Sequence, residues 1–248
     1  MPYTAIAQAP TVTLPRLKAL TTGSNPTFLD AILNIAEDSQ SGAALEHTDT
    51  WLRQLVKSGR HNRTLFAGDD TWLRLFPTHW FDETDGVSSF FVSDYTVVDH
   101  NVSRHLDVWL DRDPFHVLVL HYLGLDHIGH LGGPRHLQMK FKQEEMDLVV
   151  ERLCNYLAEQ DRRDGGNSLI VLTGDHGMTE GNARTSQRSY NELYRYYEKV
   201  QQIDLVPTLA SLMQVGIPQY RPERAIEFGA LWEIVSTNEQ VCKRWVIV

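Results

Sequence analysis

The chain has 248 residues, 42% of them hydrophobic, which is enough to bury the core of one large globular domain. Its formal net charge of -9 and its pI near 5.6 disfavour a nucleic-acid backbone or an anionic membrane surface as the main partner. The two cysteines exclude a disulfide framework or a thiolate zinc site, and the printed sequence has neither a leader-like start nor a run long enough to span a membrane. We therefore expect one soluble domain over residues 1–248.

Short apolar runs that are typical of buried strands alternate along the chain with segments of helical periodicity. The predicted helices are 27–37, 45–58, 134–160 and 204–213, and the predicted strands are 65–68, 87–93, 116–123 and 168–173. Residues 182–202 are polar and carry no strand signal where the alternation would place one. The pattern predicts an α/β fold, a mostly parallel sheet with helices on both faces.

Acidic residues and histidines follow two of the predicted strands directly. Asp126 and His130 come after the strand that ends near residue 123, and Asp175 and His176 come after the strand that ends at residue 173. Ligands of parallel sheets bind at the carboxyl ends of the strands, so the two pairs are expected to converge there. Carboxylate and imidazole ligands suit zinc, or less well manganese or iron. A single pair of this kind is more often a helix cap and a surface histidine.

A hydroxyl near the N-terminus is a candidate partner for this site. Pro10 and Pro15 flank Thr13, and this pattern predicts an extended backbone that fixes its hydroxyl. Zinc would lower the pKa of such a hydroxyl enough to make it a nucleophile. On spacing alone, Thr13 is equally an ordinary threonine in a turn. His121 and His127 lie close to the first pair and could support its ligands.

Together these segments resemble the alkaline-phosphatase superfamily, which combines a Pro-Thr-x-Thr-x-Pro nucleophile strand with Asp-x-x-x-His and Asp-His-Gly-Met. Within it the chain looks like the lumenal domain of the GPI ethanolamine phosphate transferases, most of all the fungal branch that modifies the second mannose. The segments that carry this resemblance are Pro10-Thr-Val-Thr-Leu-Pro-Arg, Gly68-Asp-Asp-Thr-Trp, Ser89-Phe-Phe-Val-Ser-Asp-Tyr and His121-Tyr-Leu-Gly-Leu-Asp-His-Ile-Gly-His.

The resemblance implies a role for each candidate residue. Thr13 matches the nucleophile, Asp175 and His176 match ligands of the zinc that activates it, and Asp126 and His130 match ligands of a second zinc. The implied reaction moves phosphoethanolamine from phosphatidylethanolamine through Thr13 to a mannose of the GPI-glycolipid precursor. It also implies the lumenal face of the endoplasmic reticulum membrane, with a small regulatory membrane subunit as a possible partner. Two N-glycosylation sequons, at Asn62 and Asn101, would suit that compartment.

The chain departs from the family pattern in three places. The family has an earlier strand ending in an aspartate ligand, a Gly-x-His after Asp-His-Gly-Met, and many membrane spans. The printed sequence begins after the first, reads Gly181-Asn-Ala-Arg at the second, with an atypical region over 183–199, and has no such spans. We expect each zinc site to lack one ligand, zinc to bind weakly and transfer to be slow or absent.

Two other interpretations stay open at this stage. One is a soluble nucleotide pyrophosphatase or phosphodiesterase, which shares the threonine nucleophile and the two-zinc layout. The other is a non-catalytic truncated remnant, in which a lost strand would leave an open edge or a gap in the sheet.

Overall fold

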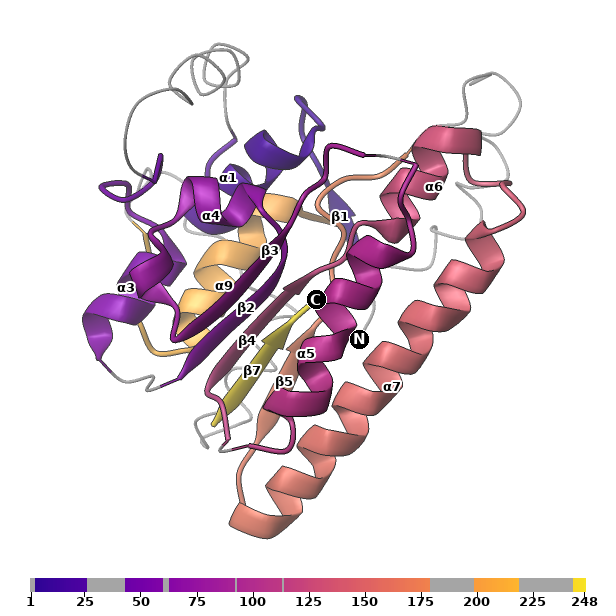
Figure 1. Ribbon diagram of the computed structural model, residues 1–248. Helices are drawn as coiled ribbons and strands as arrows, with labels where there is room; N and C mark the ends of the chain where they lie inside the picture. The colour runs from indigo at the N-terminus through magenta and orange to yellow at the C-terminus, as the bar shows by residue number, and fades with distance from the viewer. Residues whose placement is uncertain are drawn as a thin grey trace.

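A five-stranded sheet organises the computed structural model, which describes residues 3–25, 43–59, 63–91, 93–112, 114–178, 199–218 and 243–248 (Figure 1). The order is β3-β2-β4-β7-β5, and every neighbouring pair is parallel. A smaller parallel sheet pairs β1 (Thr4–Ile6) with β6 (Lys199–Gln201). The strands of the large sheet are β2 (Thr64–Asp69), β3 (Glu83–Val87), β4 (Val117–His121), β5 (Ser168–Val171) and β7 (Arg244–Ile247).

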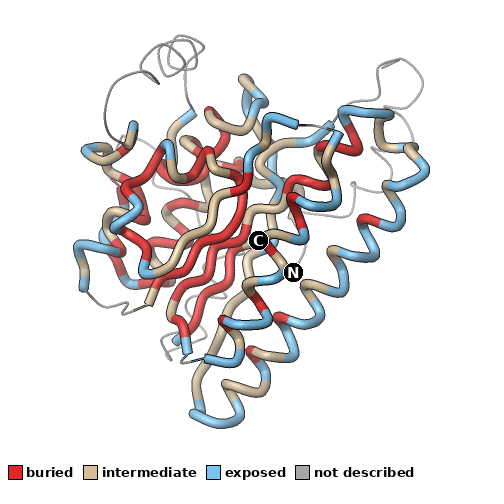
Figure 2. Tube along the Cα trace, viewed as in Figure 1, coloured by how far each residue is buried: buried red, intermediate tan, exposed pale blue. Residues whose placement is uncertain are grey.

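Helices cover both faces of the large sheet, which confirms the predicted fold class (Figure 1). Side chains alternate along each strand, so that Val117 and Val119 of β4 face one core while Leu118 and Leu120 face the other. Figure 2 shows the central strands as the most deeply buried part of the trace. The first core is covered by α1 (Thr13–Thr22), α3 (Trp51–Ser58), α4 (Thr71–Leu75) and α9 (Leu205–Leu212), and the second by α5 (Val97–Trp109) and α7 (Met139–Asp164).

Most of the predicted elements within the described residues are confirmed with shifted ends. Three of the four predicted strands correspond to β2, β4 and β5, and the helices predicted at 134–160 and 204–213 correspond to α7 and α9. The helix predicted at 45–58 begins only at Trp51, because the Thr50 hydroxyl oxygen caps it by accepting the Arg53 N–H at 3.0 Å. The helix predicted at 27–37 lies outside the described residues.

The strand predicted at 87–93 is wrong, because the strand in this region is β3, which ends at Val87. This strand pairs only with β2, at the edge of the sheet, and its first four residues are half-buried. An edge strand can carry the polar sequence Glu-Thr-Asp-Gly, which gives no hydrophobic signal. The apolar run that followed it in the sequence instead includes Phe90 and Phe91, both exposed.

A strand also lies where none was predicted, since β6 occupies the end of the polar segment 182–202. It pairs with β1 rather than with the large sheet. Residues 179–198, which include most of the atypical region 183–199, lie outside the described residues.

The C-terminal segment forms β7, which the sequence pattern did not indicate. This strand lies between β4 and β5, with Trp245 in one core and Val246 in the other. Within the described part of the chain the centre of the sheet is therefore continuous, without the gap that the remnant interpretation envisaged. No helix in this described part has the length and apolar character needed to cross a membrane.

Candidate active site

The first candidate pair lies on a short helix, α6 (Gly124–Gly132), which begins just after β4 at the carboxyl edge of the sheet. Asp126 is in its first turn and His130 is one turn further on, so both side chains lie on the same side of the helix. The carboxylate Oδ2 and the imidazole Nε2 are 3.2 Å apart. His130 is the more open of the two, with 57% of its side chain exposed.

The second pair lies in the loop that follows β5, at the same edge of the sheet. Asp175 Oδ2 is 3.5 Å from His176 Nε2, and Asp175 Oδ1 accepts the backbone N–H of His176 at 2.8 Å. These side chains are better shielded than the pair on α6, since only 19% and 11% of their surfaces are exposed. The aspartate thus stabilises the bend of the backbone at residues 175 and 176.

A glycine–methionine contact brings the two motifs together. A Cβ added to Gly129 of α6 would lie 2.2 Å from Sδ of Met178, the last residue of the Asp-His-Gly-Met motif. The loop after β5 therefore packs directly on α6, and a larger residue at position 129 would require the Met178 thioether to move. The structure thus brings the two segments side by side, but among the described residues it does not gather the two Asp–His pairs into one cluster.

Thr13 is not in an extended strand, and that expectation was wrong. It is the first residue of α1, and the extended backbone ends one residue earlier, at Val12. Pro15 fits here because N–H groups in the first helical turn have no intrahelical partner, so a proline loses nothing. Since the first turn carries no acidic residue, its free N–H groups and positive dipole end suit a phosphate.

A buried arginine connects α1 to the loop after β5. Arg16 is fully buried; its guanidinium donates to Gln202 Oε1 through Nε at 2.8 Å and through a second nitrogen, and to the Gln8 carbonyl at 2.7 Å. Gln202 in turn donates to the carbonyls of Gly174 and Asp175, at 2.9 and 2.5 Å. Burial lowers the pKa of Arg16, and the nearby Asp175 carboxylate partly offsets this effect. This network fixes the helix of Thr13 against the second pair.

A buried ion pair supports α6 in the same way. Asp99 of α5 is fully buried and accepts the N–H groups of Leu123 and Gly124, each at 2.9 Å, which fixes the turn between β4 and α6. Its Oδ2 is 3.2 Å from Nζ of Lys142, which is also buried. Burial raises the pKa of Asp99, although Lys142 and the two backbone donors act against that shift.

Neither supporting network was identified from the sequence. Asp99 and Lys142 lie on separate helices, and Arg16 meets Gln202 across most of the chain, so no local spacing links them. The only available signal was a charged residue inside an otherwise apolar helical face, such as Asp99 between Val98 and Val102.

The two histidines considered as supports have other partners. His121 Nδ1 accepts the indole N–H of Trp72 at 3.2 Å. His127 is buried, and its Nδ1 lies 2.6 Å from the carbonyl oxygen of Asp94, to which it donates. His127 therefore fixes α6 to the loop before α5 rather than orienting Asp126 or His130 directly.

The donor pairs fit zinc in type and spacing. Tetrahedral zinc with ligand bonds of about 2.0–2.1 Å holds neighbouring ligand atoms roughly 3.3 Å apart, close to the 3.2 and 3.5 Å within the two pairs. The count is short, however. Among the residues that the structure describes, no three His, Cys, Asp or Glu side chains come together in a way that could hold one metal ion. Each pair by itself has fewer ligands than a structural or catalytic zinc site requires.

A protein-family model matches most of the chain. The model of the Type I phosphodiesterase / nucleotide pyrophosphatase family matches residues 1–207, so the chain belongs to that family, whose fold is alkaline phosphatase-like. No solved structure matches the chain.

Individual curated relatives show which branch of the family the chain resembles. Proteins named GPI ethanolamine phosphate transferase 2 are 47% identical to the chain in Candida albicans, 44% in Schizosaccharomyces pombe and 42% in Saccharomyces cerevisiae. The matches cover 88%, 88% and 87% of this chain, but only 27%, 32% and 30% of the relatives. The resemblance to these transferases is thereby confirmed, and the chain spans less than a third of their length.

Proposed function

We propose that the chain is part of a phosphoethanolamine transferase of GPI-anchor assembly, with Thr13 as its nucleophile. The proposal rests above all on the similarity to GPI ethanolamine phosphate transferase 2. It is supported by a hydroxyl at the start of α1, joined through Arg16 and Gln202 to the loop of Asp175 and His176. The proposed donor is phosphatidylethanolamine, the acceptor is a mannose of the GPI precursor, and the compartment is the lumenal side of the endoplasmic reticulum, where a small membrane subunit would assist.

The proposed reaction has two displacement steps. Thr13 Oγ1 forms a bond to phosphorus while the bond to the diacylglycerol oxygen breaks, and the hydroxyl proton ends on that leaving oxygen. A mannose hydroxyl then forms a bond to the same phosphorus, and the Thr13 oxygen regains a proton. In each step the free N–H groups of the first turn of α1 can donate to the phosphoryl oxygens. The buried Arg16–Gln202 network keeps this turn in place.

Zinc is the proposed cofactor, held by Asp175 and His176 at the nucleophile and by Asp126 and His130 at the second site. When bound, zinc would lower the pKa of the attacking hydroxyl and offset charge on the phosphoryl oxygens. Because only two ligands of each proposed site belong to the described residues, we expect this chain to bind zinc weakly. Calorimetric titration with zinc tests this expectation, and two tightly bound ions would contradict it.

Trapping the enzyme-bound intermediate tests the nucleophile. The full chain is mixed with zinc and phosphatidylethanolamine in detergent micelles, quenched in acid and analysed by intact-protein mass spectrometry. We expect a phosphoethanolamine adduct that maps to Thr13. In Thr13→Ala the rate of adduct formation should fall by about 1000-fold or more, since the nucleophile is removed. The matched control is Thr11→Ala, an exposed threonine just before α1, which should retain the adduct.

Two other functions remain, each favoured by one observation. The family description favours a nucleotide pyrophosphatase or phosphodiesterase. An enzyme of that kind should hydrolyse a nitrophenyl nucleotide ester and should form no adduct from the lipid. The absence of a three-ligand cluster among the described residues favours a non-catalytic remnant. An adduct on Thr13 would contradict that last interpretation, whereas equal adduct levels in Thr13→Ala would overturn our assignment of the nucleophile.

A further inference from the structure

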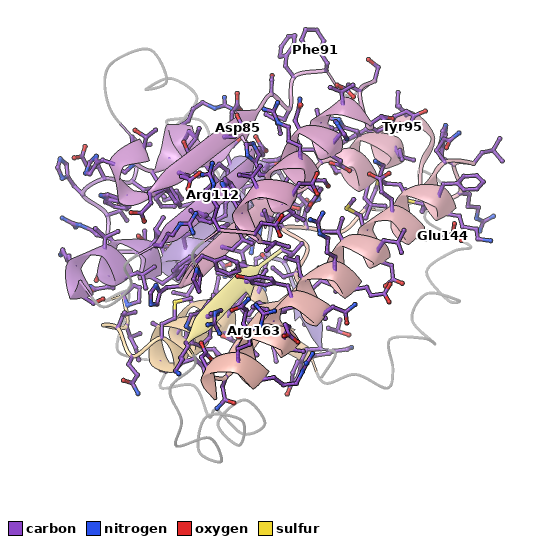
Figure 3. All side chains as sticks on the ribbon, turned by 60° about the horizontal axis from the view of Figure 1, so that its bottom comes forward. Asp85, Phe91, Tyr95, Arg112, Glu144 and Arg163 are labelled. Atoms are coloured by element: carbon purple, nitrogen blue, oxygen red, sulfur yellow. The ribbon has the colours of Figure 1, made fainter. Side chains whose placement is uncertain are left out.

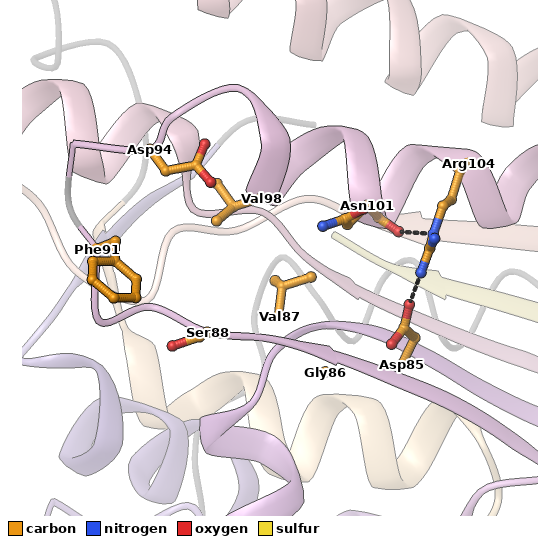
Figure 4. A pocket seen from close by; sticks show the side chains of 9 residues that line it. All are labelled: Asp85, Gly86, Val87, Ser88, Phe91, Asp94, Val98, Asn101 and Arg104. Atoms are coloured by element: carbon orange, nitrogen blue, oxygen red, sulfur yellow. Dashed lines mark hydrogen bonds and ion pairs between the residues drawn. The ribbon is translucent and has the colours of Figure 1, made fainter.

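A cavity of about 360 Å³ lies beside the candidate site and has no role in the proposed displacement steps (Figure 4). Its floor is the end of β3, one wall is the first half of α5, and its rim includes Phe91 and Asp94 from the segment between them. The volume is in the range of small-molecule sites. Since β3 is parallel to β2 and β4, the cavity opens at the same edge of the sheet as α6, and β3 lies roughly 10 Å from β4.

The charged groups in the cavity already have partners. Asp85 accepts Arg104 at 2.7 Å and His105 at 2.6 Å, as Figure 4 shows for the arginine. Burial acts to raise the pKa of Asp85, but these hydrogen bonds outweigh it and the pKa lies below its ordinary value. Asp94 Oδ1 accepts the N–H groups of Thr96 and Val97, at 3.1 and 2.8 Å.

This pairing selects for a neutral ligand. A cationic ligand would have to compete with Arg104 for Asp85, and an anionic ligand would face the carboxylates of Asp85 and Asp94. Hydroxyl groups, in contrast, can donate to the remaining lone pairs of the carboxylates and accept from the guanidinium. The lining therefore suits a polyhydroxylated molecule without charge.

An aromatic ring completes the rim. Phe91 is 65% exposed, projects outward in Figure 3, and meets the ring of Phe90 edge-on with centroids 5.2 Å apart. Holding an apolar ring in water beside a polar cavity has a cost, which a ligand with both an apolar face and hydroxyls would recover. A pyranose has this character, since its C–H groups gather on one face and its hydroxyls lie around the ring.

The segment between β3 and α5, which forms the rim of the cavity, also contacts α6. His127 donates to the carbonyl of Asp94 at 2.6 Å, and His127 is the residue after Asp126. A Cβ on Gly124 would approach the carbonyl oxygen of Tyr95 to 2.8 Å, so this segment also packs against the start of α6. A ligand held by the Phe91 segment would thus be held at a fixed distance from the first candidate pair.

We propose that this cavity binds a sugar ring of the acceptor glycan, with Phe91 stacked on the pyranose and Asp85 and Arg104 bonded to its hydroxyls. The inference rests on the proposed function only for the identity of the sugar, which is mannose. It assigns the acceptor side to β3 and α5, whereas the donor side lies at α1 and the loop after β5.

Binding of a linear mannotriose to the full chain tests the inference without donor lipid or zinc. Titration followed by protein NMR should show saturable shifts in the wild type, with Kd in the range of about 0.1–10 mM. Phe91→Ala should weaken binding by at least about tenfold. The matched control is Phe90→Ala, because that ring is adjacent and 83% exposed but does not line the cavity. Both rings are exposed, so both variants should fold, which circular dichroism verifies.

The outcomes separate this inference from the proposed function. Three results would overturn the sugar site. The wild type could fail to bind mannotriose, the two variants could weaken binding equally, or a mononucleotide could displace the sugar. None of these results depends on the Thr13 adduct. Conversely, absence of the adduct together with selective loss of binding in Phe91→Ala would leave the sugar site standing and reject the transfer step.

Discussion

The two halves of the candidate site are built in different ways. Asp126 and His130 lie on a helix whose support comes from α5 and α7, its neighbours along the chain. Asp175 and His176 lie in a loop whose supports, Arg16 and Gln202, come from α1 and from the segment before α9. The strand that precedes this loop is joined to the rest of the sheet by β7, from the far end of the sequence.

We call the pair Asp126 and His130 the helical half of the site and the pair Asp175 and His176 the loop half. The supports of the helical half come from one contiguous segment, whereas those of the loop half come from segments far apart in the sequence. The buried ion pair behind the helical half lies within residues 94–145, because Asp99 and Lys142 both belong to this segment. The loop half requires the N-terminal helix, β7 and the segment around Gln202 to be in place together. Its more shielded side chains are consistent with this dependence, and the comparison can be tested by damaging one half at a time.

The largest effect is expected for Trp245→Ala. Trp245 is fully buried in β7, so its removal should lower the free energy of unfolding by about 3–5 kcal/mol. Urea denaturation followed by circular dichroism measures this change. Leu148→Ala on α7 is the control, since Leu148 is 65% exposed and should change stability by no more than about 0.5 kcal/mol. A loss in Trp245→Ala as small as in the control would show that β7 does not join the two halves.

A somewhat smaller effect is expected when the buried ion pair is broken. Asp99→Asn keeps an oxygen for the N–H groups of Leu123 and Gly124 but removes the fully buried one of the two carboxylates next to the Lys142 ammonium, while Glu145 Oε2 stays 2.8 Å away. Because Glu145 still compensates part of the charge, the free energy of unfolding should fall by about 2 kcal/mol, less than for a buried charge left with no partner. Amide hydrogen exchange should quicken in α6 and remain unchanged in residues 173–178.

The double variant Asp99→Asn with Lys142→Met serves as the control for this experiment. Because it removes both charges, it should recover most of the loss, as neutral replacements of buried pairs often do. If the two single changes instead add in the double variant, the pair does not act as a unit.

The variant Arg16→Met tests the loop half. The methionine side chain has a volume similar to that of arginine but no hydrogen-bond donors. Gln202 Oε1 then lacks its buried partner, and the expected cost is about 1–3 kcal/mol. Hydrogen exchange should now quicken in residues 173–178 and not in α6, the reverse of the result for Asp99→Asn. The control is Arg162→Met, whose side chain is 71% exposed. Equal exchange changes in both halves would contradict the proposed separation.

The smallest effect is expected for the acid sensitivity of the ion pair between Arg244 of β7 and Asp164. Hydrogen bonding from Arg244 lowers the pKa of Asp164, although burial acts slightly in the opposite direction. A carboxylate with a lowered pKa stabilises the fold above its unfolded pKa, and this contribution is lost as pH falls through the folded value. The urea midpoint should therefore fall below about pH 4 in the wild type and fall less steeply in Asp164→Asn. Identical pH profiles would show that Asp164 contributes nothing there.

The sequence was informative where structure is local and less so where it is not. Residues 116–123 are apolar because β4 is enclosed, and residues 168–173 are apolar although β5 is a half-buried edge strand, so the positions of the Asp and His motifs after them could be predicted. The edge strand β3 could not be, because its polar residues need only one neighbouring strand.

Three further features were missed for the same physical reason, which is that they depend on tertiary packing. Thr13 was expected in a strand because two prolines flank it, yet proline is equally compatible with a first helical turn, and only packing against α3 and α9 decides between them. The position of β7 and the contact of Arg16 with Gln202 depend on partners remote in the sequence. No periodicity within a window of residues carries that information.

The position of β7 also bears on how the chain folds. β2, β3 and β4 come from one region of the sequence and pair directly, whereas Val117 of β4 meets Trp245 only after most of the intervening chain has been synthesised. Closing so long a loop costs conformational entropy before any stabilising contact forms, and this slows the pairing of β7 with β4. The centre of the sheet is thus the last part to close, and until then the inner edges of β4 and β5 present unpaired backbone on which other chains can pair.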